Sequence, residues 1–543
     1  MDARSAIEDL RRRAAAGETL EALSHAVLAL LSRPAAAVAG VAFDEEARQM
    51  ALRLTGRTMI HGGRVAGEER LRGARFLAGS LHVLADGGVH MITPDERQAE
   101  EEGKLAAVVY RPLGITVGVL RKGMNEAERS AAYSADVTVG PYRRFALDVL
   151  HDRQAQAPYD RIGRDVPAAV VTDPGHVLIA PIAEPLMLLE DDASPADALR
   201  PAARLAATLD KGQDYAIDTD RALVRLTSQG RKRVHDAFGV TDAASMQTLL
   251  LEKRVTQALA AAHCYTRGSD YDLADGSVTP LPSGALPGGV RLRGGLLQAI
   301  ETKEGVTITD TQWITATISV FEYARRYSHI GGTSLAQLMF TTELEELFNL
   351  TLWDRREAEE LRTQQQHAPQ MAAYLALNRQ IAQWSRLGTQ QRTELYGLRE
   401  RSWQPDELQT LLHRLVDAAV TQAIGDSNGD LPQLWCALSE LATNVLLEQS
   451  TGGEGAPPTA DRVRIRARAV LDDRLMSDPD RQRRGLHSAL DQAAVYQAQA
   501  EMHYRDLYWP DDLAPFEEAL TAVYDSIRTD LARAVAHQAL RPA

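Results

Sequence analysis

Between residues 88 and 180, short apolar runs alternate with stretches of helical character. The runs read "GVHMIT", "ITVGVL", "ADVTVG" and "AAVVTD", and each of them ends at a turn or a polar residue. Strands that are separated by helices favour a doubly wound parallel sheet over a set of hairpins. This part of the chain therefore predicts an α/β lobe.

The pattern changes after residue 190. "DYAIDTDRALVRLT" alternates like a pair of hairpin strands, and a helix is expected from about 243 to 265. "SVTPLPSGALPGGVRLRGG" is a connector rich in proline and glycine. From about 354 onwards the spacing of apolar residues is helical, with almost no strand signal. At 543 residues the chain is too long for one core, so several domains are expected.

Composition excludes several classes of function. With 60 basic and 74 acidic residues, the formal charge is −14, which argues against broad nucleic-acid binding. Two cysteines, Cys264 and Cys436, cannot make a disulfide framework or a four-thiolate zinc site, and they fit a reducing cytosol. No apolar run approaches the roughly 20 residues of a membrane span, so any membrane contact is expected to be peripheral.

Catalytic motifs are absent when each is tested on its chemistry. No GxxxxGK[ST] phosphate loop occurs, and no two histidines have HExxH spacing. "EEGKLA" around Lys104 lacks the first glycine and the hydroxyl, so we interpret it as a solvated turn. "GDSNG" (425–429) matches a nucleophile elbow on paper, but a helix precedes it where a strand is needed, so a loop between helices is expected.

The order of segments along the chain is more informative than any single motif. "AAGETLEAL", "HGGRVA", "GVHMIT", "LGITVGVL", "ERSAAYSADVTVGPYRRFALDVLHD" and "GGLLQAIETKEGVTI" resemble, in sequence and order, the SecA preprotein translocase motor ATPases. The fifth segment is the most specific, since it keeps these residues of a family signature: Ala132, Tyr133, Ala135, Asp136, Thr138, Gly140, Phe145, Asp148, Leu150 and Asp152. Later segments, such as "QRTELYGLRERSWQPDELQ", "LPQLWCALSEL" and "DSIRTDLARAV", are similar to the helical wing and scaffold of that family.

The resemblance implies a multidomain α/β and α architecture. It predicts a RecA-like lobe over 1–187 and 308–356, with an inserted α+β preprotein cross-linking domain over 188–307. A helical scaffold is expected over 357–402 and 455–543, and a helical wing over 403–454. The second nucleotide-binding lobe of the family, with its arginine finger, is expected to be absent, because the resemblance moves from the first lobe to the scaffold within about 40 residues.

The first lobe departs from the family at each place that handles nucleotide. Arg53 stands where the family has the glutamine that reads adenine. The family's phosphate loop has the form TGEGKT, but "GRVAGEERLRGARFLAGS" (63–80) has no Gly-Lys-Thr, and the segment is about three residues short. Arg70 and Arg72 are the remaining candidates for weak phosphate contact. Thr172 and Asp173 replace the acidic pair that holds magnesium in the family.

These departures imply a pseudo-ATPase, for which we expect neither ATP hydrolysis nor a bound cofactor. The resemblance then leaves an export-pathway protein that binds preproteins, the Sec channel or the active motor as an accessory factor. It would act in the cytoplasm, with peripheral contact at the inner face of the cell membrane and homodimer formation left open. The candidate residues for preprotein binding are Tyr215, Gln298, Glu301 and Lys303.

Two other hypotheses stay open at this point. One is a reduced ATPase subunit that completes its site with a partner. The other is a structural or self-assembling protein that has kept the fold only.

Overall fold

The computed structural model describes most of the chain. The described residues are 3–32, 40–61, 67–155, 157–183, 185–192, 195–218, 223–240, 246–274, 276–281, 295–309, 311–334, 340–353, 369–426, 460–508 and 513–540. They fall into two compact units. The first comprises Met1–Met187 and Thr317–Thr389, and the second comprises Leu188–Ala316 and Gln390–Ala543.

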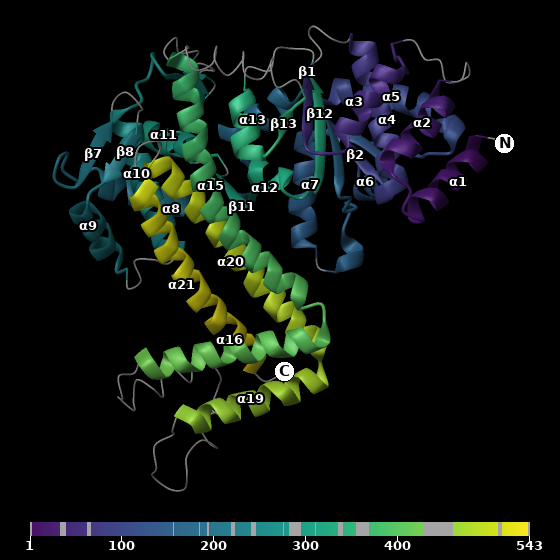
Figure 1. The fold of residues 1–543 in the computed structure, drawn as a ribbon. Coiled ribbons are helices and arrows are strands. Elements are labelled where there is room, and N and C mark those ends of the chain that lie inside the picture. Colours follow the sequence, from purple (N-terminus) through teal and green to yellow (C-terminus); the bar gives the residue numbers. More distant parts are fainter. Residues whose placement is uncertain are drawn as a thin grey trace. The chain divides into compact units, whose positions relative to one another are not determined.

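A seven-stranded sheet forms the centre of the first unit, in the order β13-β1-β12-β5-β2-β4-β3. Figure 1 labels β1, β2, β12 and β13 of this sheet. Every neighbouring pair in it is parallel. The strands are β1 (Thr58–His61), β2 (Val89–Thr93), β3 (Val117–Val119), β4 (Val137–Pro141), β5 (Ala168–Thr172), β12 (His329–Ser334) and β13 (Thr351–Leu352). The prediction of a parallel α/β lobe is confirmed, and its four predicted strands are β2 to β5.

The helices of the first unit connect these strands. They are α1 (Ala3–Ala15), α2 (Leu20–Leu31), α3 (Glu45–Leu54), α4 (Glu68–Asp86), α5 (Glu96–Tyr110), α6 (Glu126–Tyr133), α7 (Tyr142–Gln154), α12 (Val320–Ala324) and α13 (Thr341–Phe348). Most of them begin at a side chain that caps the first turn. Thr19, for example, accepts a hydrogen bond from the backbone N–H of Ala22 at the start of α2. The segment around Lys104 is not a turn, because it lies inside α5, although Lys104 itself is exposed.

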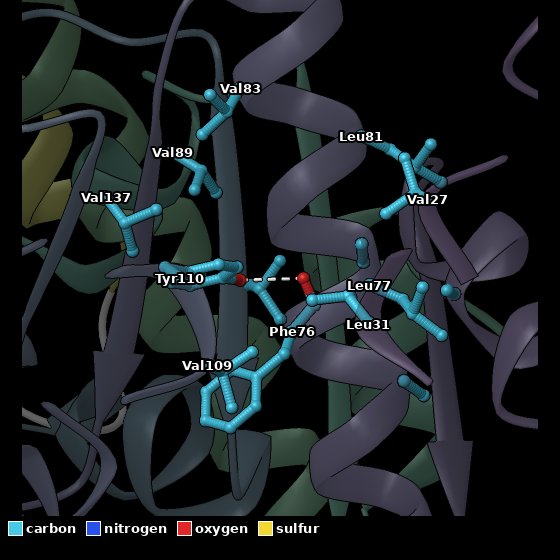
Figure 2. Close-up of a cluster of buried hydrophobic side chains, with 14 of the residues drawn as sticks. Val27, Leu31, Phe76, Leu77, Leu81, Val83, Val89, Val109, Tyr110 and Val137 are labelled. Atoms are coloured by element: carbon cyan, nitrogen blue, oxygen red, sulfur yellow. Dashed lines mark hydrogen bonds between the residues drawn. The ribbon is translucent and has the colours of Figure 1, made fainter. Parts of the chain in front are cut away.

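The core of this unit gathers around α4, which is buried along most of its length. Figure 2 shows Phe76, Leu77 and Leu81 of α4 among side chains of α2, α5 and the sheet. The ring of Tyr110 lies edge-on to that of Phe76, with 5.7 Å between centroids, and its hydroxyl donates to the Phe76 carbonyl at 2.7 Å. A buried tyrosine needs such a partner, so this bond holds α5 against α4.

The second unit begins with an α+β segment. Its helices are α8 (Pro195–Ala206), α9 (Ser228–Phe238), α10 (Met246–His263) and α11 (Leu296–Glu304). Two antiparallel hairpins accompany them, β7 (Tyr215–Asp218) with β8 (Leu223–Leu226), and β9 (Tyr271–Ala274) with β10 (Ser277–Pro280). The chain enters the unit along β6 (Leu186–Asp192) and leaves along β11 (Thr311–Ile318), and these two strands pair. The predicted hairpin and the predicted helix from about 243 are both confirmed.

From residue 369 onwards every described element is a helix. These helices are α15 (Pro369–Arg401), α16 (Pro405–Asp426), α19 (Ala460–Ser477), α20 (Pro479–Tyr508) and α21 (Leu513–Leu540). Within the second unit α20 packs along α21, and α19 packs along α16 through pairs such as His413 with Asp472. The "GDSNG" segment and the predicted wing–scaffold boundary at 454 lie mostly or wholly outside the described residues. The other boundaries proposed for the insertion, scaffold and wing stay predictions.

Candidate functional site

The start of α4 is the position where a fold of this kind holds phosphate. In a parallel sheet, ligands bind beyond the carboxyl ends of the strands, and the N-terminus of the next helix favours an anion. Strand β1 ends at His61 and α4 begins at Glu68. Residues 62–66, which include "GRVA", lie outside the described residues. The described first turn of α4 carries Glu68 and Glu69, with Gly67 as a cap that has no side chain.

Two arginines of α4 share carboxylates at this position. Arg75 Nη2 lies 2.7 Å from Glu102 Oε1 and 2.9 Å from Glu68 Oε1. Arg72 reaches the same two oxygens, with Nε at 3.1 Å from Glu102 and Nη2 at 3.3 Å from Glu68. Since Glu102 belongs to α5, the cluster joins two helices. We call Glu68, Arg72, Arg75 and Glu102 the α4 ion-pair cluster.

Two members of the α4 ion-pair cluster, Arg75 and Glu102, are buried, so water screens their attraction only weakly. Arg75 is 1% exposed and the Glu102 side chain 6%. Burial alone raises the pKa of the Glu102 carboxyl, but the charges of Arg75 and Arg72 outweigh burial and hold the pKa below its ordinary value. Burial likewise disfavours the charged form of Arg75, yet Glu102 and Glu68 outweigh it and raise the pKa of Arg75. Both side chains of the buried Arg75–Glu102 pair are therefore charged at neutral pH.

The predicted nucleotide arginines point to different partners. Arg70 lies toward the start of α3, where its Nε is 2.7 Å from Asp44 and its Nη1 is 3.0 Å from Glu46. Arg72 belongs to the α4 ion-pair cluster and also donates to the Gly40 carbonyl at 2.8 Å. Arg53 is exposed in the last turn of α3. The structure therefore does not gather these three guanidinium groups around one position.

Thr172 and Asp173 do lie at the same edge of the sheet as the α4 ion-pair cluster. Thr172 pairs in register with Thr333 of β12, and the Asp173 N–H donates to the Thr333 carbonyl at 2.8 Å. Thr333 in turn accepts a hydrogen bond from Arg75 Nη1 at 2.7 Å on its hydroxyl. Asp173 has a left-handed backbone, with φ of 54°, and its carboxylate lies 2.7 Å from His176 Nδ1. The one carboxylate left at this strand end thus binds within its own turn.

The predicted preprotein-binding residues make contacts inside the second unit. Gln298 and Glu301 of α11 are buried and both bind Thr309, with the Glu301 carboxylate accepting from its N–H at 2.8 Å. Lys303 of the same helix donates to the carbonyls of Ala261 and Tyr265, at 2.9 and 2.8 Å. Tyr215 lies on β7, and its hydroxyl is 3.0 Å from His263 Nε2. Three of the four residues therefore share one helix, and their side chains fasten it to its neighbours.

Next to them, α8 and α11 enclose a groove of about 540 Å³. Its floor is largely aliphatic, and Arg200 and Arg204 of α8 are exposed at it. It is lined by Arg200, Ala203, Arg204, Ala207, Thr302, Gly305, Val306 and Ile308. The sequence did not single out this groove, because its residues come from α8, from the end of α11 and from the residues that follow each helix, about 100 positions apart.

No helix of the described residues is long and apolar enough to cross a membrane. Among the same residues, no group of three or more His, Cys, Asp or Glu side chains is placed to hold a metal ion.

A model of the SecA DEAD-like domain family matches residues 2–345. The chain belongs to this family. It is 30% identical over 353 residues to the protein translocase subunit SecA of Rubrobacter xylanophilus. The aligned part makes up 63% of this chain and 38% of that protein. The SecA proteins of Clostridium perfringens and Carboxydothermus hydrogenoformans are 29% and 28% identical, again over 63% of this chain and over 41% and 39% of their own lengths.

This SecA-family chain thus matches less than half the length of these relatives. The matched residues include all four members of the α4 ion-pair cluster and Thr333. The sequence pointed to Arg72 but missed the contacts of Glu68, Arg75, Glu102 and Thr333. Glu102 stands in a run of three glutamates, and only its burial on α5 distinguishes it from its exposed neighbour Glu101.

Proposed function

We propose that this SecA-family chain is a non-hydrolysing protein of the export pathway. It binds preproteins, the translocation channel or the active motor as an accessory factor, on the cytoplasmic side and in peripheral contact with the membrane. The single observation that carries the loss of ATPase activity is the α4 ion-pair cluster, in which carboxylates of the chain itself take the partners that a phosphate would need.

A nucleotide phosphate near Arg75 would have to displace the partly exposed Glu68 and would lie beside the buried, charged Glu102. Repulsion between the phosphate and the Glu102 carboxylate opposes binding, because like charges at a buried site are weakly screened by water. The described residues at this edge also offer no lysine, and their one carboxylate from the former acidic pair, Asp173, binds His176.

The binding half of the proposal is supported by the second unit. The groove between α8 and α11 combines aliphatic surface with two exposed arginines. Such a surface suits an extended polypeptide, whose apolar side chains lie on the floor and whose carboxylates or carbonyls meet the guanidinium groups. The relatives are named as subunits of a protein translocase, and this name supports the proposal of a polypeptide client.

A titration with Mg-ATP tests the loss of nucleotide chemistry. We expect no phosphate release above a protein-free blank and no melting-temperature rise that depends on Arg70 or Arg72, because the α4 ion-pair cluster excludes the phosphates. A ligand at a hundredfold excess over its Kd would stabilise the fold by about 2.7 kcal/mol, which such a scan detects.

Variants of single arginines show where any nucleotide that does bind lies. A melting-temperature rise that is lost in Arg70→Ala and Arg72→Ala, and kept in Arg97→Ala on the exposed face of α5, would contradict the proposal and favour the reduced ATPase. Arg97 is a matched choice because its ion pair with Glu101 is exposed on both sides.

A further inference from the structure

The segment that is most specific to the family, "ERSAAYSADVTVGPYRRFALDVLHD", contributes no residue to the α4 ion-pair cluster. Tyr133, Phe145, Asp148 and Asp152 belong to this segment, and all four line a cavity of about 440 Å³ in the first unit. Small-molecule pockets span about 300–1,000 Å³, so this cavity has the size of a ligand site.

The cavity lies at the amino edge of the sheet. His90 is the second residue of β2, residues 163–167 lead into β5, and Arg326 to Ser328 lead into β12. Helix α7 follows β4 and runs back antiparallel to it, so its last turns reach the same edge. The phosphate position of the fold lies at the carboxyl edge, at the other ends of these strands. The two sites therefore share a sheet and no residue.

Aromatic rings form much of the cavity wall. The His90 and Phe145 rings lie 4.6 Å apart between centroids, and the pairs Tyr133–Phe145 and His90–Tyr327 are 5.9 and 5.8 Å apart. All four residues are buried. Rings in this arrangement present flat faces and edges, which suit a planar ligand.

A chain of hydrogen-bonded polar groups leads to His90 in the cavity wall. One ring nitrogen of His90 has no hydrogen-bond partner among the described residues. The Tyr323 and Tyr327 hydroxyl oxygens are 2.8 Å apart, and the Tyr327 oxygen is 2.9 Å from His90 Nδ1. The other ring nitrogen, His90 Nε2, is buried and has no hydrogen-bond partner among the described residues. Buried polar atoms are rarely left without a partner, so this nitrogen suits a ligand atom, as donor in one tautomer and as acceptor in the other.

Two carboxylates that line the same cavity supply acceptors. Asp148 accepts from the Tyr133 hydroxyl at 3.0 Å and lies 3.2 Å from Arg129 Nε. Asp152 accepts from the backbone N–H groups of Ile162 and Gly163 at 2.7 and 2.8 Å. Each carboxylate has about four lone-pair positions, so both keep acceptor capacity for N–H groups of a ligand.

We propose that this cavity binds a planar heterocycle that carries an amino group, of the size of a nucleobase or nucleoside. Its ring lies against the aromatic wall, its amino group donates to Asp152 or Asp148, and a ring atom pairs with His90 Nε2. No phosphate contact is involved, so the site is independent of whether the chain hydrolyses ATP.

Adenine and adenosine are the probes, and the full chain is the sample. We expect saturation-transfer NMR to show transfer to the ring protons, and calorimetry to give a Kd for each probe. Val149→Trp places an indole in the cavity from α7 and should weaken binding at least about tenfold. Val108→Trp is the matched control, since Val108 is 53% exposed on α5 and outside the cavity.

A second variant keeps the test decisive if the tryptophan disturbs folding. His90→Phe preserves the ring and removes Nε2, and it should also weaken both probes about tenfold while the far-ultraviolet circular dichroism stays unchanged. The proposal is overturned if neither probe shows saturation transfer with the unchanged chain. It is equally overturned if Val149→Trp and His90→Phe bind the probes as tightly as Val108→Trp does.

Discussion

At the scale of single residues, the buried pair of Arg75 and Glu102 is the strongest constraint in the first unit. Both side chains are almost fully enclosed, and their contact at 2.7 Å is shorter than the other ion pairs of the α4 ion-pair cluster. Exposed pairs on the same helices, such as Arg97 with Glu101, are screened by water and contribute little. The buried pair cannot be opened at one side without leaving a charge in the core.

Removing Arg75 should therefore destabilise the chain strongly. We expect Arg75→Leu to lower the free energy of unfolding by about 3–5 kcal/mol, because Glu102 keeps only Arg72 as a partner. The double variant Arg75→Met with Glu102→Leu should recover most of this loss, since it removes both charges. Urea denaturation measures both. Arg97→Ala serves as the control, with a change within about 0.5 kcal/mol, and an equally small effect of Arg75→Leu would contradict the interpretation.

His90 should make the stability of the first unit depend on pH. Burial lowers the pKa of His90 to about 3, with Arg326 and Arg164 adding to the effect, from an ordinary value of 6.5. Between these two values the unfolded chain binds a proton that the folded chain does not, so stability falls as the pH falls below 6.5. The contribution of His90 is a slope of about 1.4 kcal/mol per pH unit. It should be absent in His90→Phe, and urea unfolding at several values between about pH 5 and about pH 6.5 measures the difference. Equal slopes in the two proteins would show that His90 is not buried in the neutral form.

At the scale of elements, the packing of α4 depends on how closely its backbone approaches its neighbours. A Cβ atom added at Gly73 would lie 1.8 Å from the carbonyl oxygen of Ala42, so the helix passes this backbone at a distance that only glycine allows. The Ala42 N–H also donates to the Glu69 carbonyl at 2.8 Å, which anchors the same contact. This close approach carries the residues before α3 past the first turns of α4.

Replacing Gly73 by alanine should therefore act against the usual propensity. In an unobstructed helix the change from glycine to alanine stabilises by up to about 1 kcal/mol. Gly397 of α15 has no atom within 4 Å of an added Cβ, so Gly397→Ala should follow this rule. Gly73→Ala should instead destabilise by about 1–3 kcal/mol, because the backbone must shift to admit the methyl group. Differential scanning calorimetry compares the two variants. If both raise the melting temperature, the close approach at Ala42 is wrong.

At the scale of the whole molecule, the family relation and the acidic charge are the observations behind the proposal of protein clients. The net charge of −14 disfavours nucleic acid as a partner. The match to SecA covers residues 2–345, so the helical elements from α15 onwards are described by the structure alone. The export role of the chain as a whole therefore needs a test of its own.

Binding of an unfolded, signal-bearing precursor provides that test. We expect a saturable rise in fluorescence anisotropy when a labelled precursor is diluted from urea into the full chain, and none with its folded mature form. Ala203→Trp, which fills the groove between α8 and α11, should weaken binding, whereas Val108→Trp should not. If neither the precursor, nor channel-containing vesicles, nor an active SecA motor binds, the structural or self-assembling hypothesis replaces the export proposal.

Much of the fold could be predicted from the sequence because it rests on local patterns. The strands β2 to β5 are apolar runs bounded by turn residues, and α2 begins at its own cap, Thr19. Phe516, Leu520, Tyr524, Ile527 and Leu531 are spaced on one face of α21, and all are buried. The prediction failed at Lys104, because one exposed lysine and one glycine inside a long amphipathic helix resemble a turn when read alone.

The candidate site could likewise be predicted from the sequence only in part. The sequence alone determined that α4 begins without a glycine-lysine-threonine phosphate loop and with two carboxylates, since this depends only on which residues follow one another. Only the tertiary structure decided that Arg72 and Arg75 share Glu102 and that the signature residues meet His90 in a cavity at the opposite edge. Burial, pKa and partner choice depend on segments about 30 to 240 positions apart coming together. No local pattern contains that information.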